Sequence, residues 1–276
     1  MAKRDRTTYP AKVRSRITAG RGQGHGAEYR PWLTVQDVPS QGLATRILGH
    51  KTKRVHHLLS KLETDFFCLL EFSPAVSDIR EQFPLLPLEE TQAIADACGI
   101  RHPRDPKNQE DVVMTTDFVV TCLREGKQEE IARTIKYNQE LESERTLEKL
   151  EIERRYWQSR QVDWGIVTER EIPPIVVQNC RLLRDYLELS ERGLRPDEIE
   201  ILSKFLSEKV KQSATALRTI ALDCDRQLGF AQGTSLAVAY HLMATRAWPM
   251  DWQQGVDPAK PLVLLAEVST RTGGVA

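Results

Sequence analysis

Apolar and polar positions along the chain follow two different periods, and each period predicts its own kind of element. Within residues 57–71 the apolar side chains recur every three or four positions, which predicts an amphipathic helix. Residues 76–86 and 112–122 have the character of strands, and a turn at residues 124–127 leads to a returning strand at residues 130–137. The pattern therefore predicts a helix followed by strands, of which the last two form a hairpin.

The rest of the amino-terminal half adds smaller elements to this core. Residues 44–56 predict a short hairpin that turns at residues 49–52. The remaining predicted elements are a short helix at 91–99, a polar loop at 102–111, a long charged helix at 140–160 and a short strand at 164–168. Mixed helices and strands in this order predict an α/β domain.

The carboxy-terminal part of the sequence is mainly helical. Helices are predicted from Pro173 to about residue 189, and at 196–209, 215–228 and 235–248, followed by a strand at 261–269. Helices followed by a β element suit a winged-helix-like module. The helix at 235–248 has only His241 and Arg246 as obvious polar contacts, so binding to DNA and docking to a protein both remain open for this module.

Charge is distributed unevenly, although the formal net charge of the 276 residues is zero. Residues 1–60 contain 12 Lys or Arg and 3 Asp or Glu, whereas residues 61–276 contain 27 and 36. We therefore expect three parts: a basic arm at 1–35, an α/β domain at 36–168 and a carboxy-terminal domain at 169–276. The arm is glycine-rich between Gly20 and Gly26 and is expected to be flexible, but it lacks the Lys-Ser/Thr of a phosphate-binding loop. A basic arm is typical of a polyanion contact or of a solvated leader.

Cysteines and apolar runs limit the class of protein further. The five cysteines are far apart and form no Cys-x-x-Cys pair, so we expect reduced core residues and no zinc site. No apolar stretch resembles a secretory signal or a membrane span. These observations predict a cytoplasmic protein.

Three residues carry the candidate chemistry: Glu63 on the first helix, Asp117 inside a strand and Lys136 on the returning strand. An ionised carboxylate is costly in an apolar strand unless it is paired or binds a metal. Two acids can hold a hard cation through oxygen, and a nearby lysine suits chemistry on a phosphate. The structural alternatives are a solvated helix carboxylate for Glu63 and a cross-strand ion pair between Asp117 and Lys136.

Six stretches of the sequence resemble the TnsA family, the endonuclease subunits of heteromeric bacterial transposases. They are GRGQGHG (20–26), PWLTVQDVPS (31–40), HKTKRVHHLLSKLE (50–63), DIREQFPLLP (78–87), TTDF (115–118) and ERTLEKLEIERRYW (144–157). The resemblance implies a restriction-endonuclease-like domain with a mixed sheet, followed by a winged-helix-like domain. It also implies cleavage of the 5′ ends of a transposon, the non-transferred strands.

The resemblance assigns the site as well. It implies that Glu63, Asp117 and Lys136 are catalytic, and that Glu63, Asp117 and the carbonyl of Ile135 bind Mg²⁺, for which Mn²⁺ is expected to substitute. The family usually has Gln or Glu two residues before the lysine, whereas this chain has Thr134. A longer metal ligand is therefore missing, and water or the Ile135 carbonyl is expected to take its place.

The same resemblance implies three partners: double-stranded DNA of the transposon ends, the transposase TnsB and the AAA+ regulator TnsC. Basic side chains of the arm are expected to contact phosphates, namely those of Arg4, Arg6, Lys12, Arg14, Arg16 and Arg21. Two other functions stay open. The chain could be a non-catalytic assembly module that bridges TnsB and TnsC, which the Thr134 departure favours, or a stand-alone restriction or repair nuclease.

Overall fold

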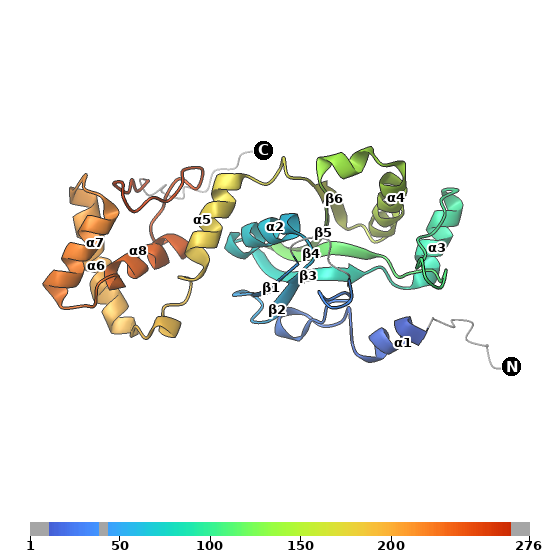
Figure 1. The fold of residues 1–276 in the computed structure, drawn as a ribbon, viewed down its shortest axis with the longest axis horizontal. Helices are drawn as coiled ribbons and strands as arrows, with labels where there is room; N and C mark the ends of the chain where they lie inside the picture. The colour runs from blue at the N-terminus through green and yellow to red at the C-terminus, as the bar shows by residue number, and fades with distance from the viewer. Residues whose placement is uncertain (1–10, 39–43, 266–276) are drawn as a thin grey trace. The chain divides into compact units, whose positions relative to one another are not determined.

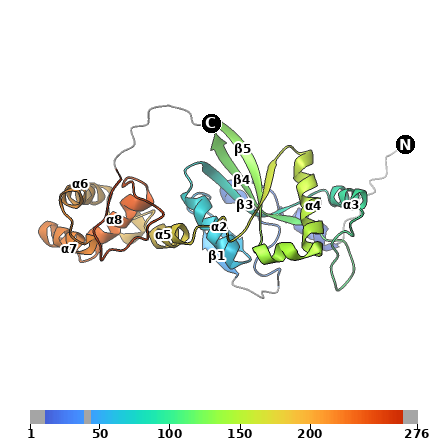
Figure 2. The ribbon, with the colours of Figure 1, turned by 90° about the horizontal axis from the view of Figure 1, so that it is seen from above.

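A computed structural model of the chain describes residues 11–38 and 44–265, and these divide into two compact units at the junction of Ile172 and Pro173. Figures 1 and 2 show the two units from two directions. The first unit is a mixed α/β structure and the second, over its described residues, consists of helices and loops. The mixed α/β fold class is confirmed.

The first unit is built around a mixed sheet with the strand order β3-β4-β5-β6. The first three strands are antiparallel to their neighbours, and β6 pairs with β5 in parallel. The sheet strands are β3 (Val76–Pro84), β4 (Thr115–Arg124), β5 (Lys127–Ile135) and β6 (Asp163–Val167), and a separate hairpin consists of β1 (Thr45–Leu48) and β2 (Val55–Leu58). The helices are α1 (Ala11–Thr18), η1 (Gly26–Glu28), α2 (Lys61–Phe72), α3 (Leu88–Ala97), η2 (Asn138–Glu142) and α4 (Glu144–Ser159).

Helices α2 and α4 pack on opposite faces of the sheet. Phe118 of β4 makes an edge contact with Phe66 of α2, with ring centroids 5.6 Å apart. The next residue, Val119, belongs instead to the buried cluster that contains Tyr156 and Trp157 of α4. Because successive side chains of a strand point to opposite faces, this alternation of contacts places the sheet between the two helices.

Several predicted elements are present with shifted ends. The helix predicted from residue 57 begins at Lys61, because His57 and Leu58 pair with β1 and Ser60 caps the helix. The helix predicted from residue 140 begins at Glu144, after a 3-10 turn. The strand predicted to end at residue 86 ends at Pro84, and the two hairpin strands extend closer to their turn than predicted.

The prediction that residues 1–35 form a flexible arm is wrong for residues 11–35, the part of it that the structure describes. Residues 11–18 form α1, and Val13, Tyr29 and Trp32 are buried against the rest of the unit. The glycines permit this close packing, since a Cβ on Gly22 would lie 2.3 Å from the ring of Pro84. Large apolar side chains placed after the glycines therefore fix the segment, an effect that its charge did not reveal.

The second unit consists of α5 (Pro174–Arg184), η3 (Ser190–Arg192), α6 (Pro196–Gln212), α7 (Leu217–Leu228) and α8 (Thr234–Ala244). The carboxylate of Asp225 in α7 accepts hydrogen bonds from the backbone N–H groups of Gly233 and Ser235, at 2.7 and 2.8 Å, and so satisfies the start of α8. Most residues of α8 are buried, so this helix is the core of the unit. The remaining residues of the helix, Thr234, Leu236, Ala237 and His241, are half-buried.

The wing predicted at residues 261–269 is not confirmed. Residues 261–265 form no strand, and 266–269 lie outside the described residues. The preceding segment is instead held by Asn179, whose amide donates to the carbonyls of Trp252 and Gln254 and accepts from the N–H of Val256. A loop tied down by one buried amide takes the place of the expected β element.

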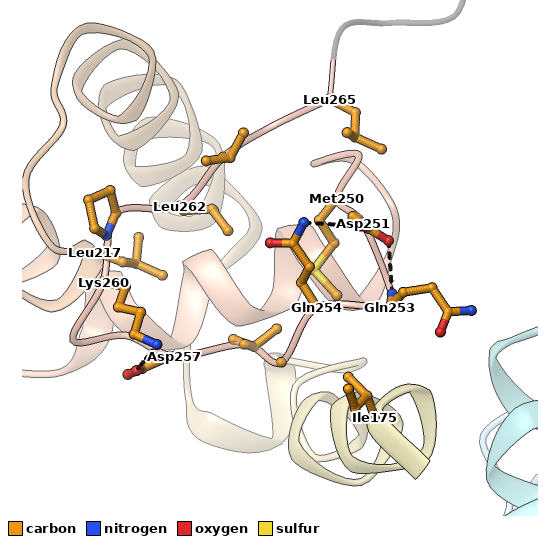
Figure 3. A pocket seen from close by; sticks show the side chains of 14 residues that line it. Ile175, Leu217, Met250, Asp251, Gln253, Gln254, Asp257, Lys260, Leu262 and Leu265 are labelled. Atoms are coloured by element: carbon orange, nitrogen blue, oxygen red, sulfur yellow. Dashed lines mark hydrogen bonds and ion pairs between the residues drawn. The ribbon is translucent and has the colours of Figure 1, made fainter. Parts of the chain in front are cut away.

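A cavity of about 380 Å³ lies under this carboxy-terminal loop (Figure 3). Ile175 and Leu217 line it together with residues of the segment 250–265. Its charged side chains are engaged locally, with Lys260 3.6 Å from Asp257, and with Asp251 accepting from Gln254. The cavity is therefore lined by apolar and polar groups together, and these charged side chains already have partners.

Candidate active site

Glu63 lies in the first turn of α2, and its carboxylate points into the first unit. Ser60 caps the helix by accepting a hydrogen bond from the backbone N–H of Glu63, and Glu63 Oε2 accepts one from the N–H of Leu59 at 2.9 Å. The residue is only 6% exposed. The interpretation of Glu63 as a solvated surface carboxylate is therefore wrong, because the helix start turns it inward.

Asp117 and Lys136 meet beside this helix. Lys136 Nζ lies 3.3 Å from Asp117 Oδ2 and donates to the carbonyl oxygen of Ile135 at 2.9 Å. The same Asp117 oxygen accepts the backbone N–H of Ile135 at 2.7 Å. The end of β5 is thus fastened to β4 through the carboxylate. Lys136 follows Ile135, the last residue of β5, and does not lie within the strand as predicted, although its ammonium group reaches Asp117.

Gln82 of β3 connects the two acids, and the sequence reasoning did not single it out. Its Nε2 lies 3.3 Å from Glu63 Oε2 and 3.5 Å from Asp117 Oδ1. The three predicted side chains and this amide therefore form one group. The signal that could have found Gln82 is a polar residue in an otherwise buried strand, next to the equally buried Glu81.

Burial and like charge shift the proton affinities in this group. Burial, followed by the nearby negative charge of Asp117, raises the pKa of Glu63 to about 7. Burial alone would lower the pKa of Lys136, but Asp117 and Glu153 outweigh it and raise that pKa. Lys136 is therefore a cation at neutral pH, beside a pair of acids that repel each other.

Glu153 of α4 is a second residue that the sequence reasoning missed. Its Oε1 accepts hydrogen bonds from Thr116 at 2.7 Å, from Trp164 at 3.1 Å and from Thr134. Burial raises the pKa of Glu153 to about 7. The hydrogen bond from Thr134 thus joins β5 to α4. The charged pattern of the helix had suggested only a solvated face.

A cavity of about 340 Å³ opens onto this group. Asp117, Thr134, Lys136 and Glu153 line one part of it, and Lys149 of α4 lines another. Burial and the positive charges of Arg145 and Lys136 lower the pKa of Lys149. The cavity is accessible, and its two lysines line it together with three acids, Asp117, Glu140 and Glu153.

The donor set fits a hard divalent cation. Two carboxylates, on Glu63 and Asp117, and the carbonyl oxygen of Ile135 are oxygen ligands of the kind that Mg²⁺ prefers. Within residues 11–38 and 44–265 there is no group of three or more His, Cys, Asp or Glu side chains placed to hold a metal ion. A cation here would consequently need the carbonyl, water or the substrate to complete its coordination.

The six basic residues predicted to contact DNA lie in different surroundings. Lys12 and Arg14 are exposed on α1, whereas Arg16 and Arg21 pair with Asp37 at 3.0 and 2.6 Å. Those two arginines hold the amino-terminal segment together, and their phosphate contacts stay a prediction. Arg4 and Arg6 lie outside the described residues.

Two further expectations from the sequence concern the whole chain. All five cysteines lie in the described part, and no disulfide joins them. Among the described helices, none combines the length and the apolar character that crossing a membrane requires.

Comparison with known proteins matches both halves of the chain. The family model for the TnsA-like endonuclease N-terminal region matches residues 73–169, and that for the TnsA endonuclease C-terminal region matches residues 171–252. The Transposon Tn7 transposition protein TnsA of Escherichia coli is 52% identical over 183 residues, which are 66% of this chain and 66% of that protein. Asp117, Lys136 and Gln82 fall inside the first match, and Glu63 precedes it.

Both matched family models are described as regions of TnsA endonucleases, and the relative is a transposition protein, so the matches define a class of DNA-transposition endonucleases. The chain belongs to the TnsA endonuclease family.

Proposed function

We propose that the chain is a Mg²⁺-dependent DNA endonuclease that hydrolyses the 5′ ends of a transposon, the non-transferred strands. The observation that carries the proposal is the approach of Lys136 Nζ to within 3.3 Å of Asp117, beside the buried carboxylate of Glu63. Membership of the TnsA family supports it. A purely structural ion pair would not need a second buried acid or an open cavity in front of it.

Each residue of the candidate site would have its own role in hydrolysis. Glu63, Asp117 and the Ile135 carbonyl would hold Mg²⁺, with Mn²⁺ as a substitute, and the bound cation would lower the pKa of a water and offset charge on the phosphate. Lys136 would orient the attacking water or contact the scissile phosphate. Gln82 and Glu153 would keep the acids and β5 in place through their hydrogen bonds.

Lys149 adds a second positive charge to the cavity. It shares the cavity with Lys136, and no carboxylate within the described residues forms an ion pair with its ammonium group. A backbone phosphate next to the scissile one would meet this lysine. Contacts of this kind position DNA without reading its sequence.

The partners belong to the same proposal. The relative's name places it in Tn7 transposition. We propose that this chain acts on double-stranded transposon ends in the bacterial cytoplasm, together with a TnsB-type transposase and a TnsC-type AAA+ regulator. The near-neutral net charge supports weak DNA binding by the chain alone, with recognition of the ends left to the transposase.

The test is strand-resolved cleavage of a transposon end by the reconstituted complex with Mg²⁺, comparing wild type with Lys136→Ala. The expected result is loss of the 5′-strand cut while 3′ cleavage and joining persist. Lys127→Ala is the matched control, because Lys127 begins β5 whereas Lys136 directly follows the end of that strand. Unchanged 5′ cutting by Lys136→Ala would overturn the proposal and favour the assembly module, and cutting by the purified chain alone would favour a stand-alone nuclease.

A further inference from the structure

Gln82 interrupts β3 at the point where the strand passes the acids. The strand pairs regularly before and after it, with Glu81 opposite Phe118 and Phe83 opposite Thr116. Gln82 itself has φ of 50°, in the left-handed region that a residue with a Cβ seldom adopts. A conformation of this kind persists only where the surroundings hold it, and it often marks a functional site.

Residues 22–32 hold the backbone of Gln82 in this conformation. The N–H of Trp32 donates to the carbonyl of Gln82 at 3.1 Å, and the hydroxyl of Tyr29 donates to the carbonyl of Glu81 at 3.0 Å. The ring of Pro84 packs against Gly22, where any Cβ would collide with it. The strained backbone at Gln82 is therefore fixed on both sides by residues 22–32.

The side chain of Gln82 has a defined orientation. Thr115 donates its hydroxyl to Gln82 Oε1 at 3.2 Å, and the other end of the amide is the NH₂ group, because ionised carboxylates only accept hydrogen bonds. That NH₂ group faces Glu63 and Asp117, at 3.3 and 3.5 Å. An amide nitrogen carries two N–H donors, so it can serve one carboxylate with each.

We infer that Gln82 is a positioning residue, whose amide holds the carboxylates of Glu63 and Asp117 at the separation that a divalent cation requires. This inference rests on the proposed function, since it assumes that the two acids bind the cation. The two carboxylates repel each other when both are ionised, and the donors between them offset that repulsion. The residues 22–32 thereby become part of the support of the site, although they lie far from it in the sequence.

The role differs from that of a buried side chain that only fills space. Hydrogen-bonding partners of metal ligands typically affect cation affinity by about 10–100-fold when they are changed. A space-filling glutamine would affect the free energy of unfolding and leave cation affinity unchanged once the protein is folded. Cation binding therefore separates the two roles.

The experiment is a titration of the purified full chain with Mn²⁺, followed by the electron paramagnetic resonance signal of the free ion. Gln82→Asn keeps an amide in a residue that tolerates positive φ but shortens its reach, and Gln82→Gly removes the amide while relieving the backbone strain. Gln161→Ala is the matched control, because Gln161 has φ of 57° and is exposed. Melting temperatures show whether each variant is folded.

We expect Gln82→Asn and Gln82→Gly to be folded and to bind Mn²⁺ about 10–100-fold more weakly, with Gln161→Ala unchanged. Wild-type affinity in a folded Gln82→Gly would overturn the inference. The variant Asp117→Asn distinguishes failure of the positioning role of Gln82 from failure of the proposed cation site. If Asp117→Asn abolishes binding and the Gln82 variants do not weaken it, only the positioning role is wrong, whereas wild-type binding by Asp117→Asn would refute the proposed cation site and the inference with it.

Discussion

Arg54 and Glu81 form a doubly hydrogen-bonded ion pair in the interior of the first unit, with Nη1–Oε1 and Nη2–Oε2 distances of 2.8 and 2.6 Å. Their side chains are 7% and 0% exposed. His56 adds a contact of 2.7 Å to the same carboxylate. The pair joins the β1–β2 hairpin to β3, one residue before Gln82, so its integrity bears directly on the candidate site.

Removing one partner of this pair is expected to destabilise the protein strongly. In Glu81→Gln the guanidinium of Arg54 would remain buried without a counter-charge, which costs about 3–5 kcal/mol in comparable cases. Urea unfolding followed by circular dichroism measures the loss. Glu200→Gln, which breaks the exposed pair with Lys204, is the control and should leave the midpoint unchanged.

Acid should weaken the same pair within a defined range of pH. Burial alone would raise the pKa of Glu81, but hydrogen bonds from Arg54 and His56 outweigh it and lower the pKa from 4.5 to about 2. The stabilisation is therefore complete above about pH 4.5 and is lost as the pH falls towards 2. The difference in free energy of unfolding between wild type and Glu81→Gln should shrink over that range, and a constant difference would contradict the assignment.

The contribution of Glu153 to the free energy of unfolding should depend on pH in the opposite sense. Because burial raises its pKa from 4.5 to about 7, ionised Glu153 costs stability, and the cost grows as the pH rises through this range. Glu153→Gln keeps an acceptor for Thr116 and Thr134 and cannot ionise. It should match wild type below about pH 4.5 and exceed its free energy of unfolding by on the order of 3 kcal/mol above pH 7. Denaturant unfolding at pH 4 and pH 8 tests the sign, and a variant that gains stability only in acid would refute it.

Removal of the Arg21 and Lys12 side chains should affect the melting temperature differently, although both residues were predicted to contact DNA. Arg21 pairs with Asp37, whose pKa is held well below its usual range by hydrogen bonds from Thr34 and Arg21 that outweigh the effect of burial. Arg21→Ala should therefore lower the melting temperature. Lys12→Ala should leave the melting temperature unchanged and, if the phosphate contact exists, reduce the salt dependence of DNA binding. Equal melting temperatures for the two variants would contradict the structural role of Arg21.

Lys149 should contribute one phosphate contact at the cavity. We expect Lys149→Ala to weaken DNA binding similarly for all sequences, and to reduce the slope of log affinity against log salt concentration by about 1. Binding of a transposon-end duplex by the reconstituted complex at several salt concentrations gives that slope. Lys127→Ala, roughly 30 Å from Lys136 along β5, is the control, and a slope changed equally by both variants would show that the effect is not specific to the cavity.

The sequence by itself indicated the elements that carry the candidate site. A helical period around Glu63 and a strand pair with a Gly126 turn were enough to expect Glu63, Asp117 and Lys136 in a mixed α/β core, because local periodicity decides which residues share a face. In the structure Lys136 Nζ lies 3.3 Å from Asp117, and Gln82 lies between Asp117 and Glu63. The chemical role assigned to them, and the Mg²⁺, are still predictions.

Only the tertiary structure decided which charged residues are buried and what they contact. Arg54, Glu81 and Glu153 belong to stretches rich in charge, and a charge pattern alone does not distinguish an exposed cation from one that is paired in the interior. The positive φ of Gln82 likewise depends on Trp32, fifty residues earlier in the chain, whose N–H binds its carbonyl. Local propensity fixes the type of an element, whereas contacts between residues distant in sequence fix burial, pairing and strain, and it is these contacts that bring Gln82 between the two acids.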